Sequence, residues 1–579
     1  MASRVPSLLG LILAKPLRTV CSPCLRSALL FFVAALAGGC GRRPNTGEVR
    51  PVAGTVAVRN PAAFWNSATI YFLLTDRFRN GNPANDRALG RAQDGAVLRS
   101  FQGGDLAGVL QKTEEGYFDS LGITAIWMTP FVEQIHAGVD EGTGKTYGYH
   151  GYWTRDWTRV DPALGTEDDL RAVVDAAHRH GIRVLLDAVI NHTGPSTPQD
   201  PAWPDDWVRT APNCSYKSYA TTVDCTLVAT LPDIRTDSDA PVELPPALLE
   251  KWAREGRRDR EVASLDAFFR RTGYPRAPRY YIIKWLTDWV RDFGFDGYRL
   301  DTAKHFEPAV SAELKQEAEK ALADWRRKHP DQVRDSLPFY MVGEVYGWEP
   351  SQGRNYDFGD RRVDFLANGY DALINFGFKS DTGSLDRLFT RYSATINQGA
   401  LRGVSLLNYL SSHDDGSPYD VDRKDPLGAG TRLLLSPGGA QIYYGDELAR
   451  PLRVSGAEGD ANLRSFMNWG DSERRVEVLP HWRKLGRFRR AHPAVGAGVH
   501  RTLQANPYIF SRTLESGGRV DRVLVAMDQG EGAKTIPVFG VFPNGTELVD
   551  AYTGASGKVR NGRVSLTSGS GLVLLTELR

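Results

Sequence analysis

Eight short apolar runs, separated by stretches with helical periodicity, constrain the fold of this 579-residue chain more than any other feature. The stretches between the runs include the amphipathic segments 167–180 and 281–293. The runs lie at 70–74, 123–128, 184–190, 295–300, 339–342, 373–376, 404–410 and 441–444. Eight buried strands that alternate with helices predict an α/β fold of the (β/α)8 barrel (TIM barrel) type.

Two parts of the chain do not follow this alternation. Residues 194–275, between the third and fourth runs, are rich in Pro and Asp and have no strong period, which predicts a loop-rich inserted domain. From about Gly486 onward, short runs are separated by Gly, Asn and Ser turns. This spacing predicts a C-terminal antiparallel β-sandwich over 487–579. The barrel itself then consists of 61–193 and 276–486.

The N-terminus resembles an export signal. Basic residues precede an apolar run at 28–36 that is too short to span a bilayer comfortably. Small residues then lead to Cys40, as in a bacterial lipoprotein signal, so we expect residues 1–39 to be a signal peptide, Cys40 to be lipidated and 40–60 to be a tether. Ala37 stands where the lipoprotein pattern usually has Leu, so simple secretion stays open. The protein is expected to be periplasmic or anchored in an outer membrane, alternatively secreted.

Only two cysteines, Cys214 and Cys225, follow Cys40. They lie eleven positions apart inside the predicted insertion. In an exported protein we expect them to form a disulfide that closes a local loop, with two free thiols as the alternative.

The charge balance argues against a nucleic-acid partner. Residues 1–39 contain four of the 71 basic residues and none of the 69 acidic ones, so the rest of the chain has a net charge of −2. Nucleic-acid binding relies on an excess of positive charge, which this composition lacks.

Polar side chains follow several of the predicted strands, at the end of the barrel where barrel enzymes place their chemistry. They include Asp187 and His192 at the end of the third run, Arg299 and Asp301 at the end of the fourth, Glu344 after the fifth, and His413-Asp414 after the seventh. Arg299 and Asp301 share one face of their strand, so the guanidinium is expected to keep the carboxylate ionised. Any one of these groups also suits a structural role. Together they can break a glycosidic bond, because one carboxylate attacks, one acid protonates the leaving oxygen and other groups hold hydroxyls.

These segments resemble, in order, the conserved regions of the α-amylase family of glycoside hydrolases (glycoside hydrolase family 13). The resemblance extends over about residues 65–575. The matching segments are 122–130, 149–153, 187–192, 231–233, 297–305, Glu344, 413–414 and 443–447. Within the family, 156–158 and 296–305 look most like bacterial periplasmic α-amylases.

The resemblance implies a retaining hydrolase that cleaves internal α-1,4-glucosidic bonds of starch, maltodextrin or related α-glucans. By this resemblance Asp301 is the nucleophile, Glu344 the general acid and base, and Asp414 the transition-state stabiliser. It assigns substrate binding to His150, Tyr152, His192, Arg299, Lys304 and His413. The alternatives are a transglycosylase or exo-acting maltogenic enzyme on the same substrates, and a non-catalytic glycan-binding scaffold. We expect a monomer that contacts a membrane only through a lipid anchor.

The resemblance also implies Ca²⁺ in two places. Asn191, Asp233 and the backbone oxygen of His305 are expected to share one ion at the junction of barrel and insertion, because hard oxygen donors suit calcium. A second ion is expected where the chain resembles a calcium loop of cyclodextrin-forming relatives. The residues of that loop are Asn80, Asn82, Asn85, Asp86, Gly103 and Asp105. A turn-rich loop that binds nothing is the alternative there.

Overall fold

The computed structural model describes residues 60–140, 142, 144–470 and 476–578. The predicted signal peptide, Cys40 and all but the last residue of the predicted tether lie outside these residues. Among the described residues, no helix combines the length and the apolar character that crossing a membrane requires.

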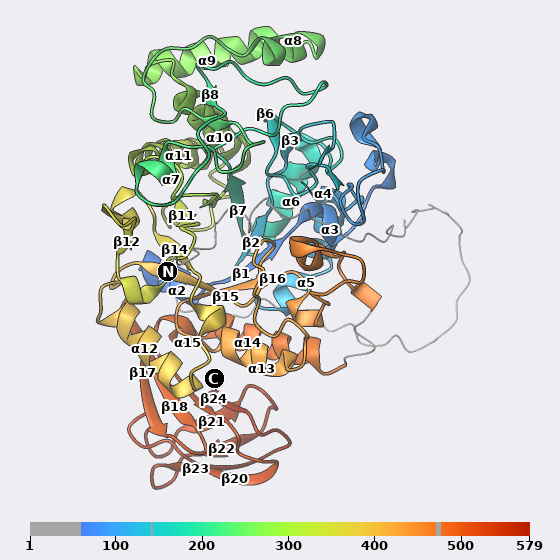
Figure 1. Ribbon diagram of the computed structural model, residues 1–579. Helices are drawn as coiled ribbons and strands as arrows, with labels where there is room; N and C mark the ends of the chain where they lie inside the picture. The colour runs from blue at the N-terminus through green and yellow to red at the C-terminus, as the bar shows by residue number, and fades with distance from the viewer. Residues whose placement is uncertain (1–59, 141, 143, 471–475, 579) are drawn as a thin grey trace, which may run out of the picture.

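Eight parallel strands form a closed barrel in the middle of the molecule (Figure 1). They follow one another around the barrel in sequence order, and the first pairs with the last, Thr69 opposite Ala440. The strands are β1 (Thr69–Leu73), β2 (Ala125–Met128), β7 (Arg183–Ala188), β10 (Gly297–Leu300), β11 (Tyr340–Gly343), β14 (Ala372–Asn375), β15 (Ser405–Tyr409) and β16 (Gly439–Tyr443). Each predicted apolar run overlaps one of them, so the predicted barrel is confirmed.

Amphipathic helices connect the strands and cover the barrel. The predicted segments 167–180 and 281–293 form α6 and α10, and α6 begins with a capping box between Thr166 and Asp169. The larger helices are α4 (Leu106–Glu114), α6 (Glu167–Arg179), α10 (Pro278–Phe293), α11 (Pro308–Lys328), α12 (Leu385–Asn397), α13 (Pro426–Leu434) and α14 (Val478–Ala491). The shorter elements are α2 (Pro61–Ser67), α3 (Thr75–Phe78), α5 (Tyr117–Ser120), α15 (Ala494–Ala497) and the strand pairs β4 (Val139–Asp140) with β5 (Lys145–Thr146) and β12 (Asn355–Asp357) with β13 (Arg362–Asp364).

The insertion between β7 and α10 caps one end of the molecule (Figure 1). Its elements are β8 (Val208–Arg209), α7 (Ala220–Val223), β9 (Asp233–Ile234), α8 (Pro246–Arg254) and α9 (Arg258–Thr272). The first part is loop-rich as predicted, and the Cys214–Cys225 disulfide is present. The last part differs, because α8 and α9 are helices that the sequence did not indicate. Helix α9 buries only Leu265, Phe268 and Phe269, so its apolar period is weak.

Buried charges fasten the two inserted helices to the barrel. The carboxylate of Asp156, on β6 (Thr154–Val160), accepts hydrogen bonds from Lys251 Nζ at 2.8 Å and Arg257 Nη2 at 2.6 Å. Burial raises the pKa of Asp156, but these two cations outweigh that effect and lower it to about 2. Strand β6 pairs with β3 (Val132–Gln134), so the helices rest on an antiparallel extension beside the barrel.

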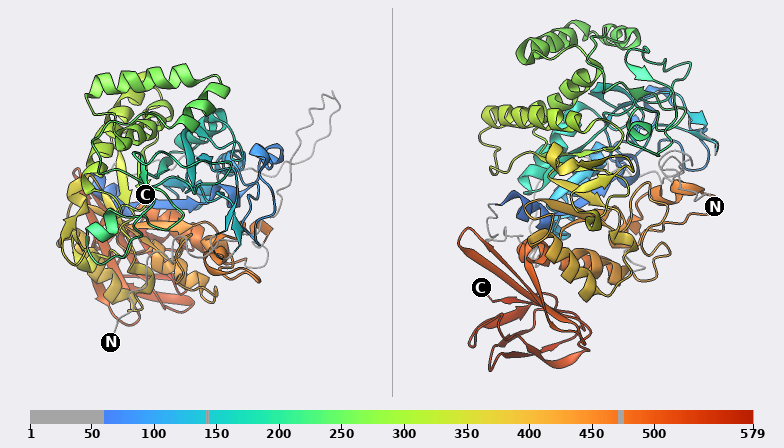
Figure 2. Two further views of the ribbon diagram at one scale, coloured as in Figure 1. Left: turned by 45° about the horizontal axis from the view of Figure 1, so that its top comes forward. Right: turned by 60° about the vertical axis from the view of Figure 1, so that its left-hand side comes forward.

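The C-terminal part is antiparallel β-structure, as predicted, at the end of the molecule opposite the insertion (Figure 2). One sheet has the order β17 (Val499–Gln504), β18 (Ile509–Ser516), β19 (Arg519–Ala526), β24 (Val573–Glu577), β21 (Glu547–Asp550), β22 (Ser556–Lys558), and β20 (Gly532–Pro537) pairs with β23 (Arg563–Ser568). The predicted boundary after Gly486 falls inside α14. A Cβ on Gly486 would lie 1.9 Å from Leu121 O, so this glycine serves close packing rather than a turn. The other domain limits stay predictions.

Candidate active site

Three buried carboxylates gather at the C-terminal ends of the barrel strands. Asp301 directly follows β10, Glu344 directly follows β11, and Asp414 lies in the loop after β15. Their exposed fractions are 5%, 4% and 9%. Besides burial, a neighbouring carboxylate raises the pKa of each group. Asp414 acts on Asp301, Asp301 on Glu344 and Glu344 on Asp414, so all three lie in one cluster.

Arg299, on β10, is the centre of this cluster. Its Nη1 lies 2.6 Å from Asp301 Oδ1 and 2.9 Å from Asp187 Oδ1, and its Nη2 lies 3.0 Å from Glu344 Oε2. The side chain is 1% exposed, so these contacts are shielded from water. A planar guanidinium with several donors can hold carboxylates in fixed relative positions, which a lysine cannot do.

Burial raises the pKa values of the two central carboxyls, Asp301 and Glu344, to different extents. It raises the pKa of Asp301 to about 6, although the Arg299 charge lowers that pKa. It raises the pKa of Glu344 to about 7, where Arg299 again opposes the shift and Asp301 adds to it. From the sequence, Arg299 was expected to keep Asp301 ionised. In the structure one guanidinium contacts three carboxylates, and burial outweighs its effect on the pKa of Asp301. Near neutral pH, the pKa values favour an ionised Asp301 beside a protonated Glu344.

Asp187 is a site residue whose role the sequence did not reveal. Its carboxylate, which also contacts Arg299, accepts hydrogen bonds from Tyr152 OH at 2.7 Å and Trp127 Nε1 at 2.9 Å. The Tyr152 ring in turn stacks on the ring of His413, with centroids 5.1 Å apart. One feature of the sequence could have indicated this role: Asp187 is a carboxylate inside the otherwise apolar run 184–190. A buried charge needs partners to be stable.

The three histidines surround Tyr152 and are neutral. His192 Nε2 donates to the Tyr152 carbonyl at 3.1 Å, and the Tyr152 amide donates to His150 Nδ1 at 3.1 Å. Burial lowers the pKa of His192 to about 4 and those of His150 and His413 well below the usual value. His150 Nε2 and His192 Nδ1 have no hydrogen-bond partner among the described residues, so a bound hydroxyl can satisfy them.

Lys304 borders the cluster together with two tyrosines that the sequence did not single out. Its Nζ donates to Tyr346 O and to Tyr356 OH, both at 3.0 Å. Burial lowers the pKa of Lys304 to about 8. Tyr346 lies two positions after Glu344, and Tyr356 comes from β12, so the sequence separation hides their proximity.

The predicted junction residues have oxygen atoms that suit a cation. Asn191 Oδ1 and Asp233 Oδ1 are buried and have no well-formed hydrogen bond among the described residues, although the Asn191 side chain lies near enough to lower the pKa of Asp233. Burial raises the pKa of Asp233 well above its usual range, against the effect of Arg209, which lies 3.2 Å from its other oxygen. His305 contacts the insertion, where its Nδ1 donates to Thr222 O at 3.1 Å.

The residues at this junction therefore fit a calcium ion, because orphaned amide and carboxylate oxygens are its preferred ligands. Within the part of the chain that the structure describes, no three His, Cys, Asp or Glu side chains gather as a metal site. The donors expected here are one carboxylate, one amide and a backbone carbonyl, which form no such group.

At the second predicted site, Asp105 acts as a cap. Its Oδ1 accepts from Gly81 N at 2.9 Å and Gly108 N at 2.7 Å, and its Oδ2 accepts from Asn82 N at 2.7 Å. It is the N-cap residue of α4. Three backbone donors leave this carboxylate little capacity for a cation, so Asp105 fits a calcium site poorly.

The rest of the second site is compact. Asn80 Nδ2 donates to Asp86 Oδ1 at 2.9 Å. Gly103 has a φ of +88°, and a Cβ there would lie 2.7 Å from Asp86 Oδ1. The side-chain amide of Asn85 is buried and has no hydrogen-bond partner among the described residues. The loop thus brings together four of the six predicted ligand residues in addition to the capping pair Asn82 and Asp105.

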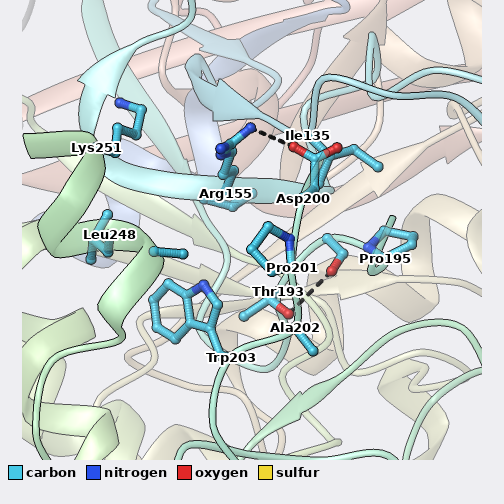
Figure 3. Close-up of a pocket in the computed structure, with 13 residues that line it drawn as sticks. Ile135, Arg155, Thr193, Pro195, Asp200, Pro201, Ala202, Trp203, Leu248 and Lys251 are labelled. Atoms are coloured by element: carbon cyan, nitrogen blue, oxygen red, sulfur yellow. Dashed lines mark hydrogen bonds and ion pairs between the residues drawn. The ribbon is translucent and has the colours of Figure 1, made fainter. Parts of the chain in front are cut away.

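A small cavity lies between β6, the first residues of the insertion and α8 (Figure 3). Its volume is about 20 Å³, enough for one water molecule and too small for a sugar. Figure 3 shows Arg155 directed at Asp200, which it contacts at 2.6 Å. The cavity therefore belongs to the support of the insertion and is no substrate pocket.

A parallel barrel that joins an ionised and a protonated carboxyl through one arginine, beside a third carboxyl and neutral histidines, defines a glycoside hydrolase of the two-carboxylate type.

Comparison with known proteins agrees. A family model described as "Alpha amylase, catalytic domain" matches residues 72–474. The chain is 36% identical over 498 residues to the periplasmic alpha-amylase of Escherichia coli (strain K12), covering 76% of this chain and 69% of that protein. It is 25% identical over 549 residues to a cyclomaltodextrin glucanotransferase of Geobacillus stearothermophilus, covering 89% and 66%. An acarbose-complexed alpha-amylase structure from Geobacillus thermoleovorans shares the fold, with a TM-score of 0.61, 22% identity and coverage of 89% and 99%. The chain belongs to the α-amylase family of glycoside hydrolases.

Proposed function

We propose that this protein cleaves internal α-1,4-glucosidic bonds of starch, maltodextrin or related α-glucans with retention of configuration. The observation that carries the proposal is the Arg299 guanidinium, which contacts both Asp301 and Glu344 through different nitrogens. Two carboxyls held by one guanidinium are near neighbours, and a short separation is what a double displacement needs.

The reaction proceeds in two steps. In the first, the Asp301 carboxylate attacks the anomeric carbon while Glu344 gives its proton to the glycosidic oxygen, so the C–O bond to the leaving chain breaks as the ester bond to Asp301 forms. In the second, ionised Glu344 takes a proton from water, and the hydroxide attacks the same carbon and releases Asp301. Two inversions restore the α-configuration.

The surrounding residues hold the sugar. We assign Tyr152 as the platform beneath the ring, oriented through its hydroxyl by Asp187. His150, His192 and His413 are neutral, so they can both donate to and accept from hydroxyls. Asp414 holds hydroxyls as charge develops in the transition state. Lys304 borders the leaving-group side.

Calcium is part of the proposal as a structural ion. Asn191, Asp233 and the backbone oxygen of His305 would hold one ion, which would supply positive charge beside the buried Asp233 carboxylate and join the insertion to the barrel. A second ion would use Asn80, Asn85, Asp86 and Gly103, with Asn82 and Asp105 shaping the loop. The orphaned oxygens of Asn191 and Asp233 support the first ion more strongly than anything supports the second.

We infer that the protein is exported, with Cys40 as a lipid anchor, and that it acts as a monomer. The signal-like residues 1–39 and the periplasmic location in the name of the Escherichia coli relative support export. The lipid anchor rests on the small residues before Cys40.

A transglycosylase is the second candidate, favoured by the similarity to cyclomaltodextrin glucanotransferases and by the tyrosines beside Lys304, where an acceptor sugar can stack. Digestion of a defined α-1,4 heptasaccharide, followed in time by chromatography, separates the two. An endo-acting hydrolase gives only shorter linear products of several lengths from the first time points. Longer or cyclic products establish the transglycosylase, and no release of reducing ends contradicts both.

A further inference from the structure

We propose that Lys379 and Asp415 form a brace that positions the neighbouring Asp414 for catalysis. Lys379 is thus a positioning residue, more than 30 positions away from the loop it acts on. The inference rests on the proposed function, because it takes Asp414 as the transition-state stabiliser.

The brace is a partly buried ion pair that closes a turn. Lys379 Nζ lies 2.6 Å from Asp415 Oδ1, with side-chain exposures of 12% and 7%. The same Nζ donates to Ser417 O at 3.1 Å, and the Ser417 amide donates back to Asp415 Oδ1 at 3.0 Å. The other oxygen of Asp415 accepts from Tyr409 OH at 2.8 Å. Both carboxylate oxygens and the turn are therefore fixed.

The contacts join the ends of two adjacent barrel strands. Tyr409 is the last residue of β15, and Lys379 lies in the short helix Phe378–Ser380 that follows β14. These strands pair directly in the barrel. A displacement of the Asp414 loop would thus have to break contacts to both strand ends.

Asp414 itself has little that could hold it. Its Oδ1 lies 3.4 Å from Ser412 Oγ, and its Oδ2 lies 3.7 Å from His413 Nε2, both long for hydrogen bonds. On the side of the loop before Asp414, Arg464 Nε donates to His413 O at 2.6 Å. Asp414 lies between two anchored neighbours, so its backbone, rather than its own side-chain contacts, sets where the carboxylate points.

Lys379 also compensates the negative charge of Asp415 beside Asp414. Asp415 is a like charge next to Asp414 and raises the pKa of Asp414, although burial is the larger cause. The ammonium of Lys379 balances Asp415. Without it, a buried carboxylate would be left uncompensated and the turn would have to rearrange to reach water.

The test compares Lys379→Met with Lys379→Arg, which keeps the charge and a similar reach. With the heptasaccharide as substrate, we expect Lys379→Met to lower kcat by about 10- to 100-fold with little change in KM, since small misplacements of catalytic groups cost this much. Lys379→Arg should recover kcat to within about threefold of wild type. A double variant with Asp415→Asn should be no slower than the slower single variant, as residues of one unit are not additive.

A matched control lies at the opposite end of the same strand. Lys315 on α11 forms a half-buried ion pair with Asp371, which directly precedes β14. Lys315→Met should lower the melting temperature about as much as Lys379→Met and leave kcat unchanged.

Three results would overturn the proposal: a Lys379→Met enzyme with kcat near wild type, an equal loss of kcat in Lys315→Met, or a loss confined to KM. A failure of the proposed function looks different. In that case wild type releases no reducing ends, or Asp414→Asn is as active as wild type, whatever the lysine variants do.

Discussion

Replacing Glu344 by Gln tests whether this residue acts as the general acid rather than as the nucleophile. The substitution keeps size and shape and removes the proton and the charge. In the structure, Glu344 Oε2 accepts from the Thr302 amide at 2.8 Å and contacts Arg299 Nη2 at 3.0 Å. The amide oxygen of Gln can keep these contacts, so the fold and the position of Asp301 should persist.

The size of the effect depends on the leaving group. General acid catalysis contributes about 10²- to 10⁴-fold, so kcat/KM for a glucan should fall by that factor, roughly 3–5 kcal/mol of barrier. A maltosyl fluoride needs no proton to depart, and its kcat/KM should fall by less than about tenfold. The ratio kcat/KM is the right quantity, because it reports the steps up to formation of the covalent intermediate.

The pH profile supplies a second readout. Burial raises the pKa of Glu344 to about 7, so wild-type kcat/KM should decline as the pH rises through 7 and the acid loses its proton. It should also decline as the pH falls through about 6 and Asp301 becomes protonated. Both limbs belong to the coupled cluster rather than to single residues. Glu344→Gln should lose the alkaline limb and keep the acidic one.

Asp301→Asn is the control, since a missing nucleophile harms both substrates alike. Equal losses for glucan and fluoride in the Glu344→Gln enzyme would refute the assignment of Glu344 as the acid. A persistent alkaline limb in that variant would refute it independently.

Other predictions concern stereochemistry, coupling, metal and membrane. Proton NMR of the first product should show the α-anomer, and an initial β-anomer excludes double displacement. Asp187→Asn should lower kcat by about 10- to 100-fold, because Tyr152 and the arginine lose a charged acceptor; activity near wild type would show that this carboxylate is dispensable. Chelation should lower melting temperature and activity together, Asp233→Ala should mimic it, and Asp86→Ala should affect stability more than rate; indifference of the melting temperature to chelation contradicts the junction ion. Cys40→Ala should release the protein from detergent extracts into the soluble fraction, whereas equal solubility of both forms indicates simple secretion.

The fold was predictable where burial is strong. All eight barrel strands are fully buried, so their apolar runs stand out, and α6 has both a capping box and a clear apolar face. Helices α8 and α9 were missed because α8 is only nine residues long, with Leu248 and Trp252 as its buried apolar residues, and α9 buries only three apolar residues near its C-terminal end. Neither segment therefore gave a long periodic apolar signal. The edge strands β17 and β22 contain no buried residue, so neither gave an apolar run to detect.

The site was predictable in its charged residues and less so in what surrounds them. Carboxylates at the ends of buried strands stand out in the sequence, because a charge at a buried position is costly unless it has partners. Contacts such as that of Lys304 with Tyr356 join residues 52 positions apart, and nothing in the local sequence encodes them. The protonation states also needed the structure, since they depend on how many carboxylates share Arg299.

The seam of the barrel has a consequence for how the protein is made. Strand β1 closes against β16, and Tyr71 OH donates to Glu447 Oε1 at 2.6 Å across 376 positions of sequence. Contacts of such high order form late, because the intervening chain must be gathered first. During synthesis the N-terminal residues leave the ribosome first, so β1 cannot pair with β16 until residue 443 has been made. Until then one edge of β1 is unpaired, and unpaired strand edges attract other chains. The time for which the seam stays open therefore governs how exposed the newborn protein is to aggregation and proteolysis.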